Sequence, residues 1–218
     1  MPDSHRSPIL LDDLLRSIRF SSVINGSAMF SALWRYDSPA YKDAVVLYLI
    51  FEGSCCVRIP ELRESVHLSA GDALFIPDSY AHTVGDSETT ASIPLDEMPA
   101  SVCDLPYGDD FLANMFRRQL IFGDDSPKTH MEALRFFAKE PFPSALLNSL
   151  PPMVKLEGFA RQRAGFLNAT FQQVVEYGAS GLMGQAIATR LGEAILVLFL
   201  RDYLSTSSHF SAGIHRAL

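Results

Sequence analysis

The sequence contains few cysteines and no CxxC pair. Its three cysteines are Cys55, Cys56 and Cys103. Neighbouring side chains on a strand point to opposite faces, so Cys55 and Cys56 are poor partners for a disulfide. Without a CxxC spacing or a second cysteine pair, a structural zinc site is not expected. So little cysteine fits a reducing compartment.

Long hydrophobic runs are also missing. No stretch approaches the ~18 apolar residues of a membrane-spanning helix, and the longest apolar runs cover 44–51 and 194–200. Residues 1–15 contain no apolar stretch long enough for a signal peptide before acidic residues interrupt it. We therefore expect a cytoplasmic protein with no membrane contact.

Positive charge is in short supply. The chain has 18 Lys and Arg against 25 Asp and Glu, a net charge of −7, and its basic residues are scattered. A chain of this charge repels phosphate backbones, so we do not expect it to bind nucleic acid by itself. With 48% hydrophobic and 20% charged residues, its 218 residues can form one large domain with a sizeable core.

Three kinds of pattern follow one another along the chain. Apolar residues at helical spacing predict a helix over 9–20. Short alternating runs separated by turns, over 28–84, predict a β-barrel or sandwich whose strands resume after residue 115. The polar connection over 85–110 is either a pocket-covering loop or mobile. Helical patterns return over 165–180 and 182–205. We expect an N-terminal arm and helix (1–27), a barrel (28–142) and a helical segment (143–218).

A family resemblance lies in residues 48–82, "YLIFEGSCCVRIPELRESVHLSAGDALFIPDSYAH". An EG turn at Glu52 is followed by a short strand, an L-x-A-G-D turn at 68–72, a strand ending in Pro77, and a terminal His82. This order resembles the cupin-type sensor domain at the N-terminus of AraC-type transcription regulators. The segments "SALLNSLPPMVKL" (144–156) and "RLGEAILVLFLRDYL" (190–204) are similar to that family's LPP turn and R-L-x-E helix.

The resemblance implies a fold and a function. The fold is mainly β: a cupin-like jelly-roll barrel with an N-terminal helix and a C-terminal helical dimerisation segment. The implied function is sensing of an unidentified small-molecule effector bound in the barrel, by a homodimer without a cofactor. Family members carry a C-terminal domain with two helix-turn-helix units that enter the major groove. We expect that domain beyond residue 218 and expect contact with DNA only through it.

The histidine at the end of the motif raises the question of a metal. Metal-binding cupins have a second motif G-x5-P-x-G-x2-H-x3-N, and Gly71, Pro77 and His82 match it, whereas Ser79 and Asp86 depart from it. The first motif should supply H-x-H and a glutamate, but residues 51–64 contain no histidine.

A mononuclear site needs about three converging ligands, so no metal site is expected. His82 then either lines a pocket or forms hydrogen bonds in a turn. Motifs of nucleophilic and metalloprotease chemistry are also missing, so we expect a protein that is not an enzyme. The alternative is a small metal-dependent cupin enzyme, a dioxygenase or an isomerase.

Four residues are candidates for ligand binding: Trp34, Arg35, Tyr48 and His82. An amphipathic Tyr48 ring pointing into a barrel suits ligand contact, and it suits core packing equally well. Trp34 and Arg35 suit stacking on a small ligand and pairing with its charge. The alternative is core packing for Trp34 and a surface role for Arg35.

The last helix carries a candidate dimer interface. Ile187, Leu191, Ala194 and Leu198 follow a four-three-four spacing compatible with a helix–helix contact. The same residues could instead pack beneath the barrel of their own chain. We expect a dimer because the homologous regulators are dimers.

Overall fold

The computed structural model of the protein describes residues 19–31, 33–78, 80–97, 119–123, 128–138, 147, 149–178 and 182–206. The helix predicted over 9–20 lies outside these residues, except for its last two positions, which are not helical. Cys103 and most of the connection predicted over 85–110 also lie outside them.

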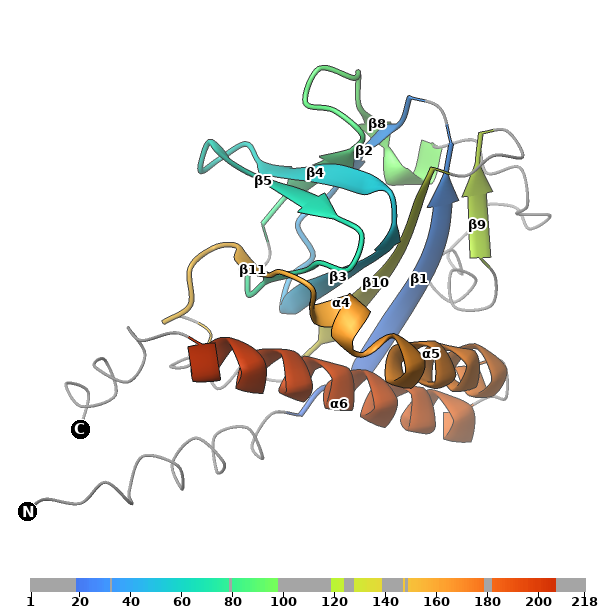
Figure 1. The fold of residues 1–218 in the computed structure, drawn as a ribbon. Helices are drawn as coiled ribbons and strands as arrows, with labels where there is room; N and C mark the ends of the chain where they lie inside the picture. Colours follow the sequence, from blue (N-terminus) through green and yellow to red (C-terminus); the bar gives the residue numbers. More distant parts are fainter. Residues whose placement is uncertain are drawn as a thin grey trace, which may run out of the picture.

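Two β-sheets face each other (Figure 1). The six-stranded sheet has the order β11 (Val154–Leu156), β6 (Ala73–Ile76), β3 (Ala44–Glu52), β10 (Thr129–Phe137), β1 (Ser22–Phe30) and β9 (Gln119–Phe122). The five-stranded sheet has the order β5 (Glu64–Ser69), β4 (Ser54–Ile59), β7 (His82–Gly85), β2 (Arg35–Ser38) and β8 (Ile93–Pro94). Neighbouring strands are antiparallel, apart from the β1–β9 and β2–β8 pairs. The predicted mainly β class with a jelly-roll barrel is confirmed.

The strands extend beyond the expected barrel limits at both ends. β1 begins at Ser22, ahead of position 28 where the barrel is predicted to start. β11 lies within the segment predicted to be helical and adds a strand to the edge of the six-stranded sheet beside β6. Residues before 28 and after 143 therefore belong to the sheet as well.

The apolar run of β3 is buried on both faces. Val46, Tyr48 and Ile50 point into the space between the sheets. The alternate residues Val45, Leu47 and Leu49 point the other way, into the core beneath the helices. A strand buried on both faces needs a nearly continuous hydrophobic run, as in "AVVLYLIF", whereas β4 alternates because its outer face is only partly covered.

In the described part of the chain after β11, three helices are found: α4 (Phe159–Gln162), α5 (Ala164–Gly178) and α6 (Leu182–Thr206). A short 3-10 helix, η1 (Leu95–Glu97), lies earlier in the chain. The predicted helices over 165–180 and 182–205 are confirmed as α5 and α6. Both run along the outer face of the six-stranded sheet (Figure 1).

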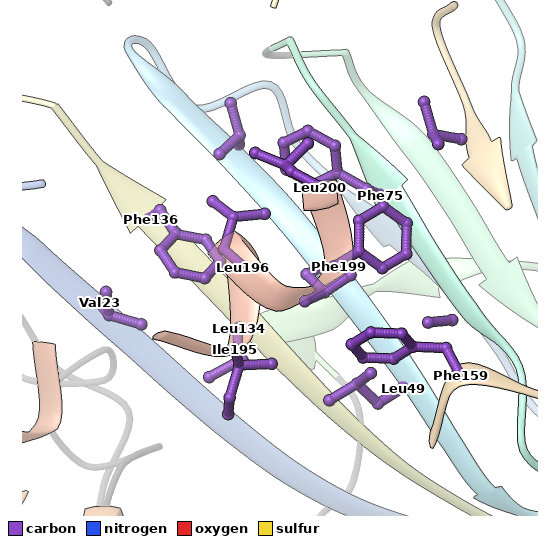
Figure 2. Packing of buried hydrophobic residues seen from close by; sticks show 14 of the residues in the cluster. Val23, Leu49, Phe75, Leu134, Phe136, Phe159, Ile195, Leu196, Phe199 and Leu200 are labelled. Carbon is purple, nitrogen blue, oxygen red and sulfur yellow. The ribbon is translucent and has the colours of Figure 1, made fainter. Parts of the chain in front are cut away.

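Helix α6 packs on that sheet with one apolar face. Ile195, Leu196, Phe199 and Leu200 contact side chains from β1, β3, β6 and β10 (Figure 2). Residues Met183–Thr206 are long and apolar enough to cross a membrane, but half of that stretch is buried in the structure. Core helices that pack inside a protein satisfy the same criterion, so this composition is explained by packing.

The R-L-x-E segment positions α6 against β1. Glu193 is buried and its Oε1 accepts the Phe20 backbone N–H at 2.8 Å, just before β1. Arg190 Nη1 lies 2.6 Å from the other Glu193 oxygen. A Cβ placed on Gly192 would come within 2.7 Å of Val23 Cγ1. The glycine therefore permits the close approach of helix and strand, and the glutamate fixes their register.

Candidate functional site

A buried hydrogen bond joins two of the predicted ligand-binding residues. The hydroxyl of Tyr48 on β3 lies 2.7 Å from Nε2 of His82 on β7, and both residues are almost fully buried. His82 Nδ1 lies 2.8 Å from the backbone oxygen of Tyr80. A carbonyl oxygen only accepts, so Nδ1 carries the proton, Nε2 accepts, and the Tyr48 hydroxyl donates.

The polar chain continues to β2. The side chains of Tyr36 and of Ser38, the next inward-facing residue of β2, interact with the Tyr48 hydroxyl. Burial raises the pKa of both tyrosines; the interaction with Tyr48 raises the pKa of Tyr36 further, and those with Tyr36 and Ser38 oppose the rise of the pKa of Tyr48. The polar chain therefore leads from Tyr36 of the five-stranded sheet to Tyr48 of the six-stranded sheet, and returns to His82 and the Tyr80 carbonyl on the side of the five-stranded sheet.

These groups are uncharged at neutral pH. Burial is the largest cause of the raised pKa values of Tyr36 and Tyr48. Burial lowers the pKa of His82 to about 4, with a smaller lowering by the nearby Arg135 and an opposing effect of its bond to Tyr80. A neutral imidazole with both ring nitrogens in hydrogen bonds is a satisfied core group.

Arg135 on β10 places a positive charge at the same end of the barrel. Its Nη2 donates to Ser38 Oγ at 2.8 Å, and its guanidinium carbon lies 3.9 Å from the Tyr41 ring centroid. It borders a void of about 10 Å³, which can hold about one water. Its lining comes from the β2–β3 and β6–β7 connections and the strands beside them: Pro39, Tyr41, Ala44, Val45, Val46, Asp78, Tyr80, His82 and Arg135.

Trp34 lies at the opposite end of the barrel. It is buried and stacked 3.9 Å from Phe30, which in turn stacks 4.9 Å from Phe122. Its edge borders a cleft of about 380 Å³, a volume within the range of small-molecule sites. The cleft is lined by Leu33, Trp34, Gly53, Ser54, Asp86, Lys128 and Thr129.

Arg35 points to the outer face of the five-stranded sheet. Its guanidinium donates to the backbone oxygens of Ser87 and Glu88 and to Thr83 Oγ1. It therefore ties β2 to the segment after β7. The four predicted ligand residues do not form one site: Tyr48 and His82 touch each other, Trp34 lies at the other end, and Arg35 lies outside.

Three residues of the polar cluster were not predicted: Tyr36, Ser38 and Arg135. The alternation of "RYDS" is a usable signal for the first two, because an inward Trp34 predicts that residues 36 and 38 also face inward. Arg135 gives no such signal. A strand with one buried side would bury Leu134 and Phe136, and the arginine between them would then be predicted to point outward.

A metal-binding arrangement is not found among the residues that the structure describes, where no three His, Cys, Asp or Glu side chains lie together. His82 uses both ring nitrogens in protein hydrogen bonds. Asp86, at the motif position of an asparagine, accepts the Trp34 backbone N–H at 3.2 Å and the Thr90 hydroxyl at 2.8 Å. The motif positions present here thus have structural partners.

The L-x-A-G-D turn joins the barrel to the helices. Asp72 is buried, and its carboxylate accepts the backbone N–H groups of Ser69 and Gly158 at 3.0 and 3.1 Å and pairs with Lys155 at 3.1 Å. Burial works to raise the pKa of Asp72, but these donors outweigh it and hold the pKa below its usual value. Gly71, at φ +97°, exposes its carbonyl to the first residues of α4.

The predicted dimer residues do not all lie on one face of α6, because Leu198 packs against the core between the helix and the sheet. Ile187 is 40% exposed and Ala194 is exposed, whereas Leu191 and Leu198 are half-buried. Met183, one turn before Ile187, is 82% exposed. The α6 residues that are fully buried against the sheet are others, among them Ile195 and Phe199 (Figure 2). The predicted stripe is therefore available to a partner over its first half.

Two facing sheets and the turn motif are typical of one family, and a model of the family described as Cupin matches residues 10–205. The chain belongs to the cupin family. This membership accounts for the arrangement of the EG and L-x-A-G-D turns at neighbouring strand ends. No curated protein matches the chain.

Several solved structures are similar to this cupin chain. ToxT from Vibrio cholerae, bound to an unsaturated fatty acid, is 8% identical over 86% of this chain and 57% of that chain, with a TM-score of 0.42. ToxT bound to a naphthalenyl-butenoic acid is 8% identical, with 85% and 57% coverage and a TM-score of 0.43. YhaK from Escherichia coli is 13% identical, with 62% and 40% coverage and a TM-score of 0.34. The chain thus spans less than two thirds of these proteins, and the fold assignment rests on the family match.

Proposed function

We propose that this cupin domain is the effector-sensing and dimerisation domain of an AraC-type transcription regulator. A small molecule binds at the barrel, and its binding changes how the helical segment presents a DNA-binding domain that follows residue 218. The domain itself is a cytoplasmic binding module and carries out no reaction. The observation that carries the proposal is the two-sided burial of β3.

Burial of β3 on both faces links the barrel interior to the helices. Tyr48 lies in the polar chain inside the barrel, and its neighbours Leu47 and Leu49 contact the core beneath α6. Interiors are close-packed, so a displacement of β3 on one side is felt on the other. An occupant that moves Tyr48 therefore also moves the surface on which α6 lies.

A second connection runs through Asp72. Its carboxylate binds Lys155 of β11 and the N–H of Gly158, which precedes α4. An effector can control the helices only if it binds two arrangements of the protein with different affinities. The Asp72 contacts join the barrel turn to the helical segment directly, so a shift of this turn on effector binding reaches the helices.

The exposed stripe of α6 supports a homodimer. Met183 and Ile187 are large apolar side chains exposed at its start, and Ala194 is exposed further along. Covering such a stripe removes apolar surface from water, which favours association. DNA contact is assigned to the following domain because this domain has a net charge of −7.

A thermal-shift screen of sugars, aromatic compounds and small acids tests effector binding on the purified domain. At least one class is expected to raise the melting temperature in a saturable way, because a ligand that binds only the folded state stabilises it. Metal analysis after metal-free purification is the companion experiment. Stoichiometric iron, manganese or nickel together with no stabilising ligand would replace this proposal by a metal-dependent cupin enzyme.

A further inference from the structure

Arg135 is a half-buried cation whose protein partners do not neutralise it. Among the described residues, its contacts are the Ser38 hydroxyl at 2.8 Å and the face of the Tyr41 ring at 3.9 Å. No described carboxylate lies within ion-pair distance of it. A guanidinium has five N–H donors in a planar fork and stays charged in proteins, so two uncharged partners leave most of this fork unused.

The surroundings of Arg135 are those of a binding position. Its side chain faces the barrel interior, as do its neighbours on β10, Met131 and Ala133. It borders the same small void as His82, whose imidazole is neutral and buried. The adjacent Tyr48 and Tyr36 hydroxyls are also uncharged. A lone positive charge among neutral, buried polar groups attracts an anion strongly because the local dielectric constant is low.

We propose that the effector carries a carboxylate and that this group binds the Arg135 guanidinium at the void beside His82. This proposal rests on the proposed function and names the chemical class of its effector. Two parallel N–H···O bonds from the guanidinium to the carboxylate would give the fork the geometry that it prefers. Ser38 and the Tyr41 ring then act as substitutes for the anion while the effector is absent.

The volume of the void links binding to a change of shape. About 10 Å³ admits a single water and not a carboxylate. Binding therefore requires the Tyr41 ring to leave the guanidinium, which separates the β2–β3 connection from β10. Only the rearranged form can hold the acid, so the effector discriminates between two forms of the domain, as a sensor requires.

The remaining charged group on the lining is Asp78. It is exposed, whereas Arg135 is half-buried. A carboxylate bound to Arg135 shares this lining with the Asp78 carboxylate, so removing the negative charge of Asp78 lowers the repulsion and strengthens binding. Asp78→Asn is therefore expected to bind the same acids more tightly than the unchanged protein.

The test is a thermal-shift and calorimetric panel of matched pairs on the domain. Hexanoate and benzoate are compared with hexanamide and benzamide, their neutral counterparts, and with uncharged sugars. At least one acid is expected to stabilise the domain and its neutral counterpart to have no effect. Arg135→Gln should weaken that acid's binding about tenfold or more, and Arg135→Lys, which keeps the charge without the fork, should retain part of it.

Two further variants separate anion binding from a structural role. Ser38→Ala removes the hydroxyl that Arg135 contacts, and this variant should still bind the acid. If Arg135 served only to hold Ser38 in place, Ser38→Ala would weaken acid binding as much as Arg135→Gln does. Arg58→Gln, on the outer face of β4, is the matched loss of an arginine and should change nothing. The proposal is overturned if Arg135→Gln binds the acid normally, if no acid binds, or if only neutral compounds bind. If only neutral compounds bind, the sensor function stands and the carboxylate proposal fails. If no compound binds, the sensor function and the carboxylate proposal both fail.

Discussion

The Tyr48 hydroxyl donates to His82 Nε2 over 2.7 Å, and this bond connects β3 of one sheet with β7 of the other through the barrel interior. It answers the question raised by the histidine of the cupin motif. His82 takes part in a buried hydrogen-bond chain that ends on the Tyr80 backbone oxygen. The histidine that binds metal in other cupins here joins the two sheets.

Removing the donor of this bond should destabilise the barrel. Tyr48→Phe leaves Nε2 of the buried His82 without its donor, and an unsatisfied buried acceptor costs about 1–3 kcal/mol. We expect the free energy of unfolding in urea to fall by that amount. The control is Tyr80→Phe, which keeps the backbone oxygen that His82 uses and should change stability by less than about 0.5 kcal/mol. Equal stability of Tyr48→Phe and the unchanged protein would contradict the hydrogen-bond chain.

The low pKa of His82 predicts a loss of stability in mild acid. Its pKa is about 4 in the folded protein and 6.5 in its ordinary state, so below neutrality the unfolded chain binds more protons. The stabilising contribution is complete above pH 6.5 and is lost as the pH falls towards 4. Between about pH 7.5 and about pH 5 we expect a loss of roughly 2 kcal/mol in unfolding free energy.

His82→Gln isolates this contribution because a glutamine amide does not titrate in that range. Urea unfolding of both proteins across the same pH values gives the difference. The variant should lose less stability on acidification than the unchanged protein. Parallel curves for the two would show that His82 is protonated equally in the folded and unfolded states.

Loss of the Asp72 carboxylate should destabilise the helical segment as well as the barrel. Asp72→Ala leaves two backbone N–H groups and the Lys155 ammonium without their acceptor, which costs about 2–4 kcal/mol. Its effect should be coupled to that of Lys155→Ala in a double-mutant cycle, whereas Lys42→Ala on the β2–β3 connection should add independently. Hydrogen exchange in α4 should accelerate in the Asp72 variant. Acceleration confined to the β5–β6 turn would contradict the proposed link to the helices.

The helices themselves and the strands of the barrel follow from the sequence. Helical spacing over 182–205 predicts α6 to within a residue at each end, and alternation in "SCCVRI" predicts β4. β11 was not predicted, because Val154–Leu156 is only three residues long and follows two prolines. Its pairing with β6, far away in the sequence, makes it a strand.

The candidate site was predictable only in part. The motif picks out His82, and the strand pattern picks out Tyr48 as an inward residue. Arg35 points outward once Trp34 is known to point inward, but that Trp34 is inward depends on the pairing of β2 with β7, which the local sequence does not contain. Arg135 is inward because β10 is buried on both faces by elements far away in the chain.

The exposed stripe of α6 gives a test of the dimer. Ile187→Lys with Ala194→Lys should produce a monomer, because two charges then face each other across the helix–helix contact. Both positions are exposed, so stability of the fold should stay within about 1 kcal/mol. Leu191→Lys with Leu198→Lys should also dissociate the dimer but cost more stability, since both side chains are half-buried. Gln185→Lys is the control, and an unchanged dimer mass in light scattering would exclude this interface.

The most direct test of the whole account is to read the gene downstream of the Leu218 codon. We expect the frame to continue for about a hundred residues with a basic composition and two helix-turn-helix patterns. That result would attach the effector domain to a DNA-binding domain. A stop codon directly after Leu218 would contradict the assignment to a transcription regulator.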